Sequence, residues 1–394
     1  MFRIGQEEKD AVARVIDSKQ LFKINNGAKE VFHFQEELQE KLDAKHTILM
    51  SSGQAALITG LIAMGIGPGD QVIVPAYTYI ASAMAIIAAG AIPVIAEIDE
   101  SLTLDPRDVE RKITPYTKAI MPVHIQGYPS KMDELLEIAD RHGLKIIEDS
   151  CQADGGSYKG KRLGTIGDVG AFSFNFYKVI TCGDGGALIT NNSDIHQKAL
   201  IYHDSSAVCF FGEQLDGSIE PFGGVEYRSH EIVGAIMREQ LKRLDGILTD
   251  LRAVKKRIVD GIKDKCRLNP INDSGECGST LSLIFESEEK ARAFKEALSQ
   301  ASEGRVGATV VIDTGKHVYS NWSCIMNKKG ALHPLMDPFK MEANKDIIPD
   351  YKPDMCPVTL DILSRTVHLG LNPDFSDETI ELIISSICKA ADNI

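Results

Sequence analysis

Residues 146–186 read IIEDSCQADGGSYKGKRLGTIGDVGAFSFNFYKVITCGDGG, and this stretch decides the fold class. An apolar run ends in Glu148 and Asp149, glycines recur through the middle, and Lys178 follows a second apolar run. Both runs have the length and the β-branched or aromatic content of strands. Ligands of parallel α/β sheets bind beyond the carboxyl ends of strands, so a strand that ends in two carboxylates predicts a binding site there.

The sequence on either side alternates between strand-like and helical segments. We predict strands near 71–77, 91–99, 118–125, 144–150, 170–176 and 186–192, and helices near 30–44, 54–64, 78–89 and 132–143. Nearly continuous apolar strands separated by helices are typical of a parallel sheet that is buried on both faces. The fold class is therefore α/β.

The character of the chain changes near residue 250. A helix with a basic side is predicted over 248–265, and the strand-like segments at 280–287 and 307–313 are shorter. A last helix, capped by Ser376, carries one apolar stripe of isoleucines. We therefore predict a large α/β domain over residues 1–250 and a smaller α+β domain over residues 251–394.

Composition excludes several classes of partner. The 394 residues hold 43 Lys and Arg against 56 Asp and Glu, a net charge of −13, which disfavours nucleic acid and anionic membrane surfaces. The eight cysteines lack the paired spacing of a metal site, and the N-terminus does not have the pattern of a secretory signal, so we expect no metal and a cytoplasmic location. Residues 71–96 are uncharged, but prolines and a glycine interrupt them, which favours strand, helix and strand over a membrane span.

Lys178 and Asp149 are the candidate catalytic residues. A lysine beside apolar walls loses some preference for its charged form, and a neutral amine attacks a carbonyl carbon. With the glycine turns and Ser173, these groups suit an aldehyde cofactor that has a ring nitrogen and a phosphate. Each feature also has an ordinary structural explanation: a helix cap, an exposed lysine, a simple helix start at residues 51–53 and a core aromatic at Tyr79. Their order along one chain favours the site.

The chain resembles the DegT/DnrJ/EryC1/StrS sugar aminotransferases, which are pyridoxal-phosphate enzymes of fold type I. The resemblance extends from about Ser51 to about Leu244, through SSGQAAL, GDQVIVPAYTYIAS, PVHIQGYPSKMDEL, IEDSCQADGGSYKGKRLGTIGD and AFSFNFYKVITCGDGG, and more loosely through NPDFSDETIELIISSI. It implies a mostly parallel seven-stranded sheet in the large domain and pyridoxal 5′-phosphate as the cofactor. It also implies a homodimer whose active sites are shared between the two chains.

The resemblance assigns roles residue by residue. Lys178 matches the lysine that bonds to the cofactor aldehyde, and Asp149 matches the carboxylate that pairs with the pyridine nitrogen. Gln152 matches the side chain beside the ring hydroxyl, and Tyr79 matches the aromatic that stacks on the ring. The phosphate-binding groups are backbone N–H groups at a helix start and one hydroxyl, from Ser52, Gly53, Gln54 and Ser173.

One stretch departs from the family pattern. Many relatives have Gly-x-Asn-x-Arg, whose asparagine reaches the phosphate of the neighbouring subunit, whereas residues 224–228 read Gly-Val-Glu-Tyr-Arg. An ionised Glu226 would repel a phosphate, so we expect it to turn toward a substrate amine or Arg228, or the phosphate to rely on other donors. The candidate substrate-binding residues are Arg228, Glu226, His317, Trp322 and His333, of which the last three fit a core or loop of the small domain equally well.

The implied activity is transamination from an amino acid, L-glutamate in the family, to a keto or aldehyde sugar used for lipopolysaccharide or another cell-surface polysaccharide. The acceptor is a nucleotide-linked keto sugar or a free sugar acid such as 8-oxo-3-deoxy-octulosonate. Some relatives have histidine in place of the lysine and perform dehydration, so Lys178 favours transamination.

Three other classes of protein share some of these sequence features. One is a sensor that binds the cofactor without catalysis. Another is a P-loop ATP-binding enzyme, suggested by Gly-x-x-x-x-Gly-Lys at residues 155–161, although Arg162 follows where Ser or Thr is required. A nicotinamide-dependent dehydrogenase needs Gly-x-Gly-x-x-Gly after the first strand, and this sequence lacks that pattern there.

Overall fold

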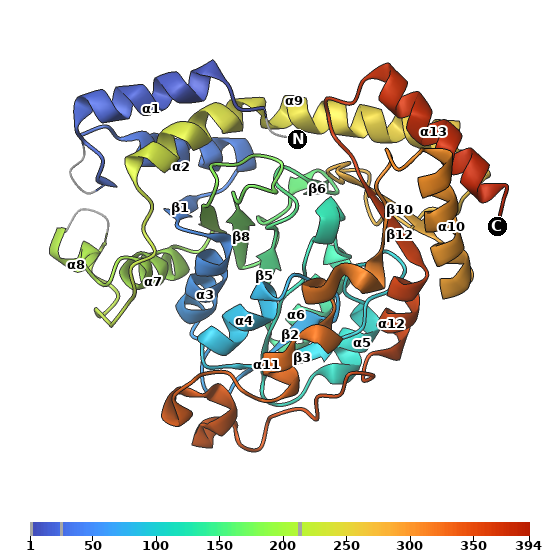
Figure 1. Cartoon of the computed structure of the whole chain (residues 1–394). Coiled ribbons are helices and arrows are strands. Elements are labelled where there is room, and N and C mark those ends of the chain that lie inside the picture. Colours follow the sequence, from blue (N-terminus) through green and yellow to red (C-terminus); the bar gives the residue numbers. More distant parts are fainter. Residues whose placement is uncertain (1–2, 24–26, 212–214) are drawn as a thin grey trace.

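A computed structural model describes residues 3–23, 27–211 and 215–394 (Figure 1). Its central sheet has seven strands, which lie from one edge to the other in the order β1 (His46–Met50), β9 (Gly186–Thr190), β8 (Val169–Ser173), β5 (Lys145–Asp149), β4 (Thr117–Ile120), β2 (Gln71–Pro75) and β3 (Ile92–Ala96). Six of these strands run in one direction, and β9 runs in the opposite direction. The predicted α/β fold with a mostly parallel seven-stranded sheet is confirmed.

Side chains alternate between two apolar layers on either side of this sheet. In β2, Ile73 packs into one layer while Val72 and Val74 pack into the other. The first layer is completed by α2 (Glu30–Leu42), α5 (Pro106–Lys112), α6 (Met132–His142) and α9 (Glu231–Gly261). The second is completed by α3 (Gly53–Ala63), α4 (Ala81–Ala88) and α7 (Ser193–His203). Because both faces are covered, the strands need the continuous apolar runs seen in the sequence.

Two sequence segments that allowed more than one interpretation have ordinary local structures. Residues 71–96 form β2, α4 and β3 in succession, as predicted. The Gly-x-x-x-x-Gly-Lys segment forms a small hairpin of β6 (Ser157–Tyr158) and β7 (Lys161–Arg162), so it is not the loop between a strand and a helix that a phosphate-binding P-loop requires. Within the described ranges, no helix has the length and apolar character needed to cross a membrane.

A second, three-stranded antiparallel sheet lies in the C-terminal part of the chain. Its order is β10 (Thr280–Ile284), β12 (Thr366–Gly370) and β11 (Thr309–Val310), and α10 (Glu288–Ala301) and α13 (Asp377–Ala391) pack together with it in one apolar cluster. Ser376 caps α13 as predicted, because its Oγ accepts a hydrogen bond from the Thr379 N–H. The helix expected at 248–265 is the second half of the 31-residue α9, which crosses the boundary at residue 250, so that boundary stays a prediction.

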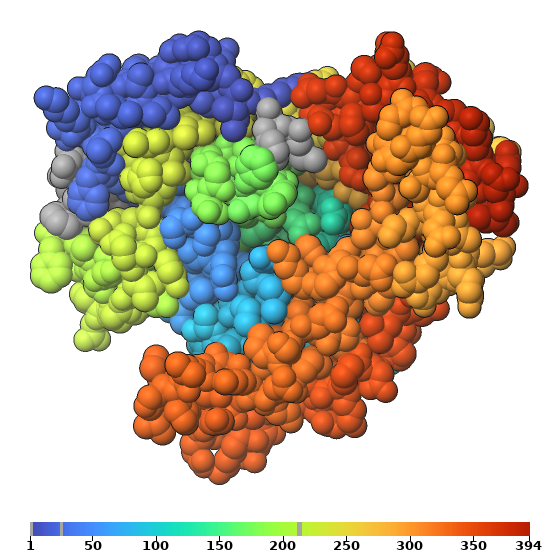
Figure 2. Space-filling view, viewed as in Figure 1, coloured from blue at the N-terminus to red at the C-terminus, as the bar shows by residue number. Residues whose placement is uncertain are grey.

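The strand expected over 307–313 is shorter than the sequence suggests. It ends at Val310, and the chain continues as a 3-10 helix, η3 (Val311–His317), in which Gly315 adopts a φ of 62°. Figure 2 shows the segment between β11 and β12, in orange, lying against residues of the large sheet's side of the molecule that are coloured blue and cyan. The other helices are α1 (Gln6–Ser18), α8 (Val208–Phe211), α11 (Ser323–Met326), α12 (Pro357–Ser364), and the short η2 (Ile125–Gly127), η4 (Tyr319–Asn321), η5 (Pro334–Met336), η6 (Pro338–Lys340) and η7 (Glu342–Asn344).

A pair of glycine substitutions tests the close packing of β8. A Cβ at Gly170 would collide with the backbone oxygen of Gly164, whereas a Cβ at Gly246, inside α9, meets nothing. We expect Gly170→Ala to lower the free energy of unfolding in urea by about 1–3 kcal/mol or more. Gly246→Ala should raise it by about 0.5–1 kcal/mol, because alanine favours the helix. Equal stabilities for the two variants would contradict this packing.

Candidate active site

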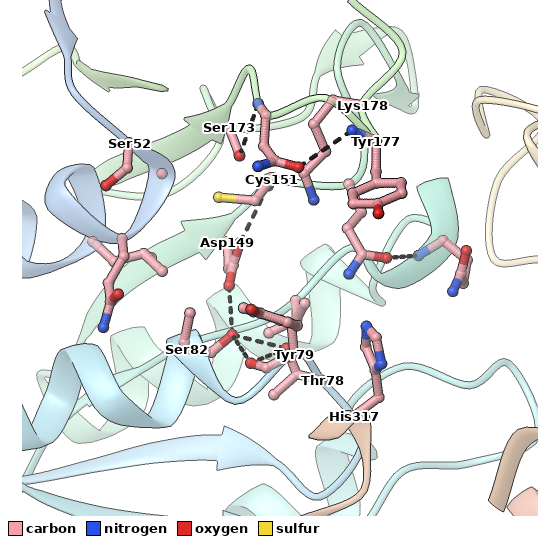
Figure 3. A pocket seen from close by; sticks show the side chains of 18 of the residues that line it. Ser52, Thr78, Tyr79, Ser82, Asp149, Cys151, Ser173, Tyr177, Lys178 and His317 are labelled. Atoms are coloured by element: carbon pink, nitrogen blue, oxygen red, sulfur yellow. Dashed lines mark hydrogen bonds between the residues drawn. The ribbon is translucent and has the colours of Figure 1, made fainter. Parts of the chain in front are cut away.

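A cavity of about 680 Å³ opens at the carboxyl ends of the parallel strands. Its walls come from the start of α3, the segment after β2, the ends of β5 and β8, and the segments around β10 and the end of η3. All of the predicted cofactor-binding residues line it: Ser52, Gly53, Gln54, Tyr79, Asp149, Gln152, Ser173 and Lys178. Figure 3 shows Asp149 near the middle of this group, between Ser52 on one side and His317 on the other.

Asp149 presents a buried carboxylate to the cavity. Its residue is 4% exposed, and its Oδ2 accepts a hydrogen bond from the Ser82 Oγ at 2.6 Å while its Oδ1 accepts one from the Cys151 N–H at 3.1 Å. Ser82 in turn contacts the Thr78 hydroxyl at 2.8 Å. No Lys, Arg or His among the described residues forms an ion pair with Asp149. A buried carboxylate is costly without a positive partner, so this geometry favours a ligand that carries one.

Glu148, the neighbouring residue, points to the opposite face of the sheet, because side chains alternate along a strand. Its buried carboxylate accepts hydrogen bonds from the N–H groups of Gly164, Ile166 and Gly167 at 2.6–2.9 Å, and it pairs with His124 Nε2 at 3.0 Å. His124 Nδ1 accepts the Ser130 N–H, so the ring proton lies on Nε2 and points at Glu148. Glu148 therefore organises the glycine-rich loop, and Asp149 is free for the cavity.

The start of α3 forms an anion-binding end of the cavity. Ser52 caps the helix by accepting the Ala55 N–H at 3.1 Å. The first N–H groups of a helix have no intrahelical acceptor, so those of Gly53 and Gln54 are available to a phosphate. A Cβ at Gly53 would lie 2.7 Å from both Cys151 Sγ and Ser173 Cβ, so only glycine lets the helix start come this close to β8.

The orientation of Gln152 follows from one backbone contact. Its Oε1 accepts the N–H of Gln126 at 3.0 Å, which leaves the amide NH₂ of Gln152 as a donor. Gln126 holds this position with a φ of 55°, an unfavourable conformation for a residue with a side chain. A donor beside a ring hydroxyl is the role that the family resemblance implies for Gln152.

Tyr79 is held against the end of η3. The Thr78 N–H donates to the His317 carbonyl at 3.0 Å, and the Ile80 N–H donates to the Lys316 carbonyl at 3.1 Å. The rings of Tyr79 and His317 are 5.5 Å apart between centroids. Burial lowers the pKa of His317 below its usual value, so this ring is neutral at pH 7.

The five predicted substrate-binding residues are not brought together. Of them, only His317 lines the cavity of its own chain. Trp322 is fully buried and its Nε1 donates to the Lys316 carbonyl at 2.9 Å, while His333 is exposed and its Nδ1 accepts the Leu335 N–H at 3.3 Å. Arg228 pairs with Asp204 and, at 2.5 Å, with Glu226.

Several residues that line the cavity were not singled out from the sequence. They are Thr78, Ser82, Gln126, Cys151, Asn175, Asp184, Ser279, Thr280 and Lys316. Polar side chains on both sides of Tyr79, directly after a strand, were the available signal for Thr78 and Ser82. Ser279 and Thr280 had no such signal, since only the second sheet brings them to the cavity. No group of three or more His, Cys, Asp or Glu side chains is arranged for a metal ion in the described part of the chain.

His368 makes the stability of the region behind the cavity depend on pH. Burial lowers its pKa to about 3, with smaller contributions from His317 and Lys255, and its Nε2 has no hydrogen-bond partner. Unfolding restores a pKa near 6.5, so the unfolded chain takes up a proton first, and stability is lost as pH falls below about 6.5.

We expect His368→Gln to lessen this loss. Between pH 7.5 and 5.5, the free energy of unfolding should fall by about 1.4 kcal/mol less in the variant than in the wild type. Denaturant titrations of both proteins at the two pH values provide the measurement. An equal loss in both proteins would show that the pKa of His368 is the same in the folded and unfolded states.

Comparison with known proteins places the chain in a family. The model of the DegT/DnrJ/EryC1/StrS aminotransferase family matches residues 3–324. The spore coat polysaccharide biosynthesis protein SpsC of Bacillus subtilis is 31% identical over 401 residues, which covers 99% of this chain and 96% of that protein. GDP-perosamine synthase of Caulobacter vibrioides is 38% identical over 267 residues, 67% of this chain and 68% of that protein.

A solved structure supports the same conclusion at the level of the fold. The X-ray structure of the aminotransferase from Psychrobacter cryohalolentis has a TM-score of 0.80 and 27% identity, and the match covers 99% of this chain and 98% of that one. The predicted family and the predicted cofactor of that family, pyridoxal 5′-phosphate, are confirmed. The chain belongs to the DegT/DnrJ/EryC1/StrS aminotransferase family.

Proposed function

We propose that this aminotransferase moves the amino group of L-glutamate to a keto or aldehyde sugar. The observation that carries the proposal is the buried carboxylate of Asp149, which has no cationic partner in the described chain and shares its cavity with Lys178. A pyridine nitrogen that keeps its proton would be the missing partner. Two relatives also support a sugar substrate through their names, GDP-perosamine synthase and a spore coat polysaccharide biosynthesis protein.

The residues of the cavity fit the phosphate, the ring nitrogen and the ring hydroxyl of pyridoxal phosphate. The phosphate would be held by the N–H groups of Gly53 and Gln54 and by the Ser173 hydroxyl, all of which line the cavity. Asp149 would bind the ring N–H, and the NH₂ of Gln152 would face the ring hydroxyl. When bound, the cofactor supplies an aldehyde that joins amines and a ring that delocalises negative charge.

Lys178 is the group that moves protons in this proposal. When the amino acid has displaced it from the cofactor, the free Lys178 amine would accept the proton of the amino acid's α-carbon as a base and then donate it as an acid. Asp149 would favour this step, because its carboxylate would stabilise the positive charge on the ring nitrogen. Ser82 and the Cys151 N–H hold that carboxylate at a fixed angle to the cavity. The same groups act in reverse order when the sugar receives the amine.

We also propose a class of acceptor sugar and an oligomeric state for the enzyme. The acceptor is a nucleotide-linked keto sugar or a free sugar acid such as 8-oxo-3-deoxy-octulosonate, destined for lipopolysaccharide or a related polysaccharide, and the enzyme acts in the cytoplasm. The active form is a homodimer. Residues 224–228, which contribute nothing to the cavity of their own chain, would then face the site of the partner.

A panel of acceptors tests the proposed reaction. The purified enzyme is first converted to its aminated form with L-glutamate and freed of excess donor. Keto sugars, with and without a nucleotide, and sugar acids are then added one at a time. We expect one class to restore the yellow absorbance of the lysine-bound cofactor within a single turnover. A protein that binds the cofactor but is never aminated by L-glutamate would instead favour the sensor.

Replacement of Lys178 tests its role as the proton carrier. We expect Lys178→Ala to lower the rate of amino transfer by at least about 10²–10⁴-fold, because general acid–base catalysis is lost. Lys161→Ala removes an exposed lysine of β7 outside the cavity and serves as the matched control. Circular dichroism of both variants checks folding. Activity of Lys178→Ala close to that of the control would exclude the assignment.

A further inference from the structure

Cationic side chains are scarce around the cavity. Among the described residues that line it, the basic side chains are Lys178, Lys316 and His317, and the ring of His317 is neutral at pH 7. The acidic side chains are Asp149 and Asp184, and Asp184 accepts the Asn175 amide at 2.9 Å. In the proposed function Lys178 bonds to the cofactor aldehyde. Lys316 is then the cation left for a substrate.

The backbone of Lys316 is anchored from two sides. Its carbonyl oxygen accepts the Ile80 N–H at 3.1 Å and the Trp322 Nε1–H at 2.9 Å. Trp322 is fully buried, so this anchor belongs to the rigid core. Trp322 therefore does not line the cavity. Its role is to fix the backbone of the segment that presents Lys316 to the cavity.

The side chain of Lys316, in contrast, has no anionic partner. Its Nζ lies over the ring of Tyr79, 4.9 Å from the centroid. No carboxylate of the described chain lies within salt-bridge distance of this Nζ, although the molecule has an acidic excess of 13 charges. A lysine without an acidic partner, held at the ring expected to stack on the cofactor, is placed to meet a negative group of a ligand.

The reaction requires such a negative group. Every amino-acid donor carries an ionised α-carboxylate at pH 7, and a sugar acid acceptor carries one as well. The phosphate end of the cavity, at Ser52, is on the opposite side from His317, the residue after Lys316 (Figure 3). Resting on the proposed function, we infer that Lys316 binds the carboxylate of the substrate at the entrance of this cavity and thereby selects anionic substrates.

The test uses the holoenzyme with three substitutions. Lys316→Gln removes the charge and keeps most of the length, Lys316→Arg keeps the charge, and Lys329→Gln changes an exposed lysine outside the cavity as the matched control. Maleate, a dicarboxylate that cannot react, is titrated by calorimetry, so this readout is independent of activity. L-glutamate and 8-oxo-3-deoxy-octulosonate are titrated separately against the two cofactor forms by absorbance.

We expect Lys316→Gln to weaken maleate binding about tenfold, near the low end for a hydrogen bond to a charged group because the side chain is exposed. Lys316→Arg should restore the affinity to within about threefold, and Lys329→Gln should leave it unchanged. A loss confined to L-glutamate among the two reactants assigns Lys316 to the donor carboxylate. A loss confined to the octulosonate assigns it to the acceptor.

Unchanged affinity for all three probes in Lys316→Gln would overturn the inference. This result is distinct from failure of the proposed function. If the wild-type protein never showed the absorbance of a lysine-bound cofactor, or if L-glutamate never changed that absorbance, the proposed function itself would be wrong. If Lys316→Gln showed the wild-type absorbance of the lysine-bound cofactor and wild-type affinities for all three probes, only the role of Lys316 would be wrong. The proposed function would still hold.

Discussion

The buried carboxylate of Asp149 is the constraint on which the rest of the site depends. It lies at the carboxyl end of a strand that is covered on both faces, where an unpaired charge is expensive. Two hydrogen-bond donors, Ser82 Oγ and the Cys151 N–H, lower that cost without neutralising the charge. The base of the cavity therefore holds a negative charge without a cationic partner, and in the proposed function a cofactor with a protonated ring nitrogen would supply that partner.

The adjacent residues Glu148 and Asp149 have different roles because of the geometry of the strand. Because consecutive side chains point to opposite faces, Glu148 binds the N–H groups of the glycine-rich loop while Asp149 faces the cavity. The loop that Glu148 holds leads into β8, which ends at Ser173, and Lys178 follows in the turn after this strand; both residues line the same cavity. One dipeptide thus contributes both the architecture of the site and its charge.

The sequence predicted the parts of the site that are local in the chain and missed those that depend on distant contacts. Lys178, Asp149 and Ser52 follow strands or start a helix, so their positions could be predicted from periodicity and from the family resemblance. Trp322 and His333 were grouped with His317 because they are near it in the sequence. In the structure, the 3-10 helix η3 and the hydrogen bond from buried Trp322 to the Lys316 carbonyl place only residues 316 and 317 of this segment at the cavity. Which face an irregular segment presents is set by tertiary packing, which no local pattern encodes.

The bond between the amine of Lys178 and the cofactor aldehyde is the central claim, and reductive trapping tests it most directly. Borohydride treatment of the purified protein converts that bond into a stable one, and peptide mapping then locates the attached pyridoxyl group. We expect one modified residue, Lys178, which directly follows AFSFNFY in the sequence. A label on any other residue, or a cofactor-loaded protein without a label, would contradict it.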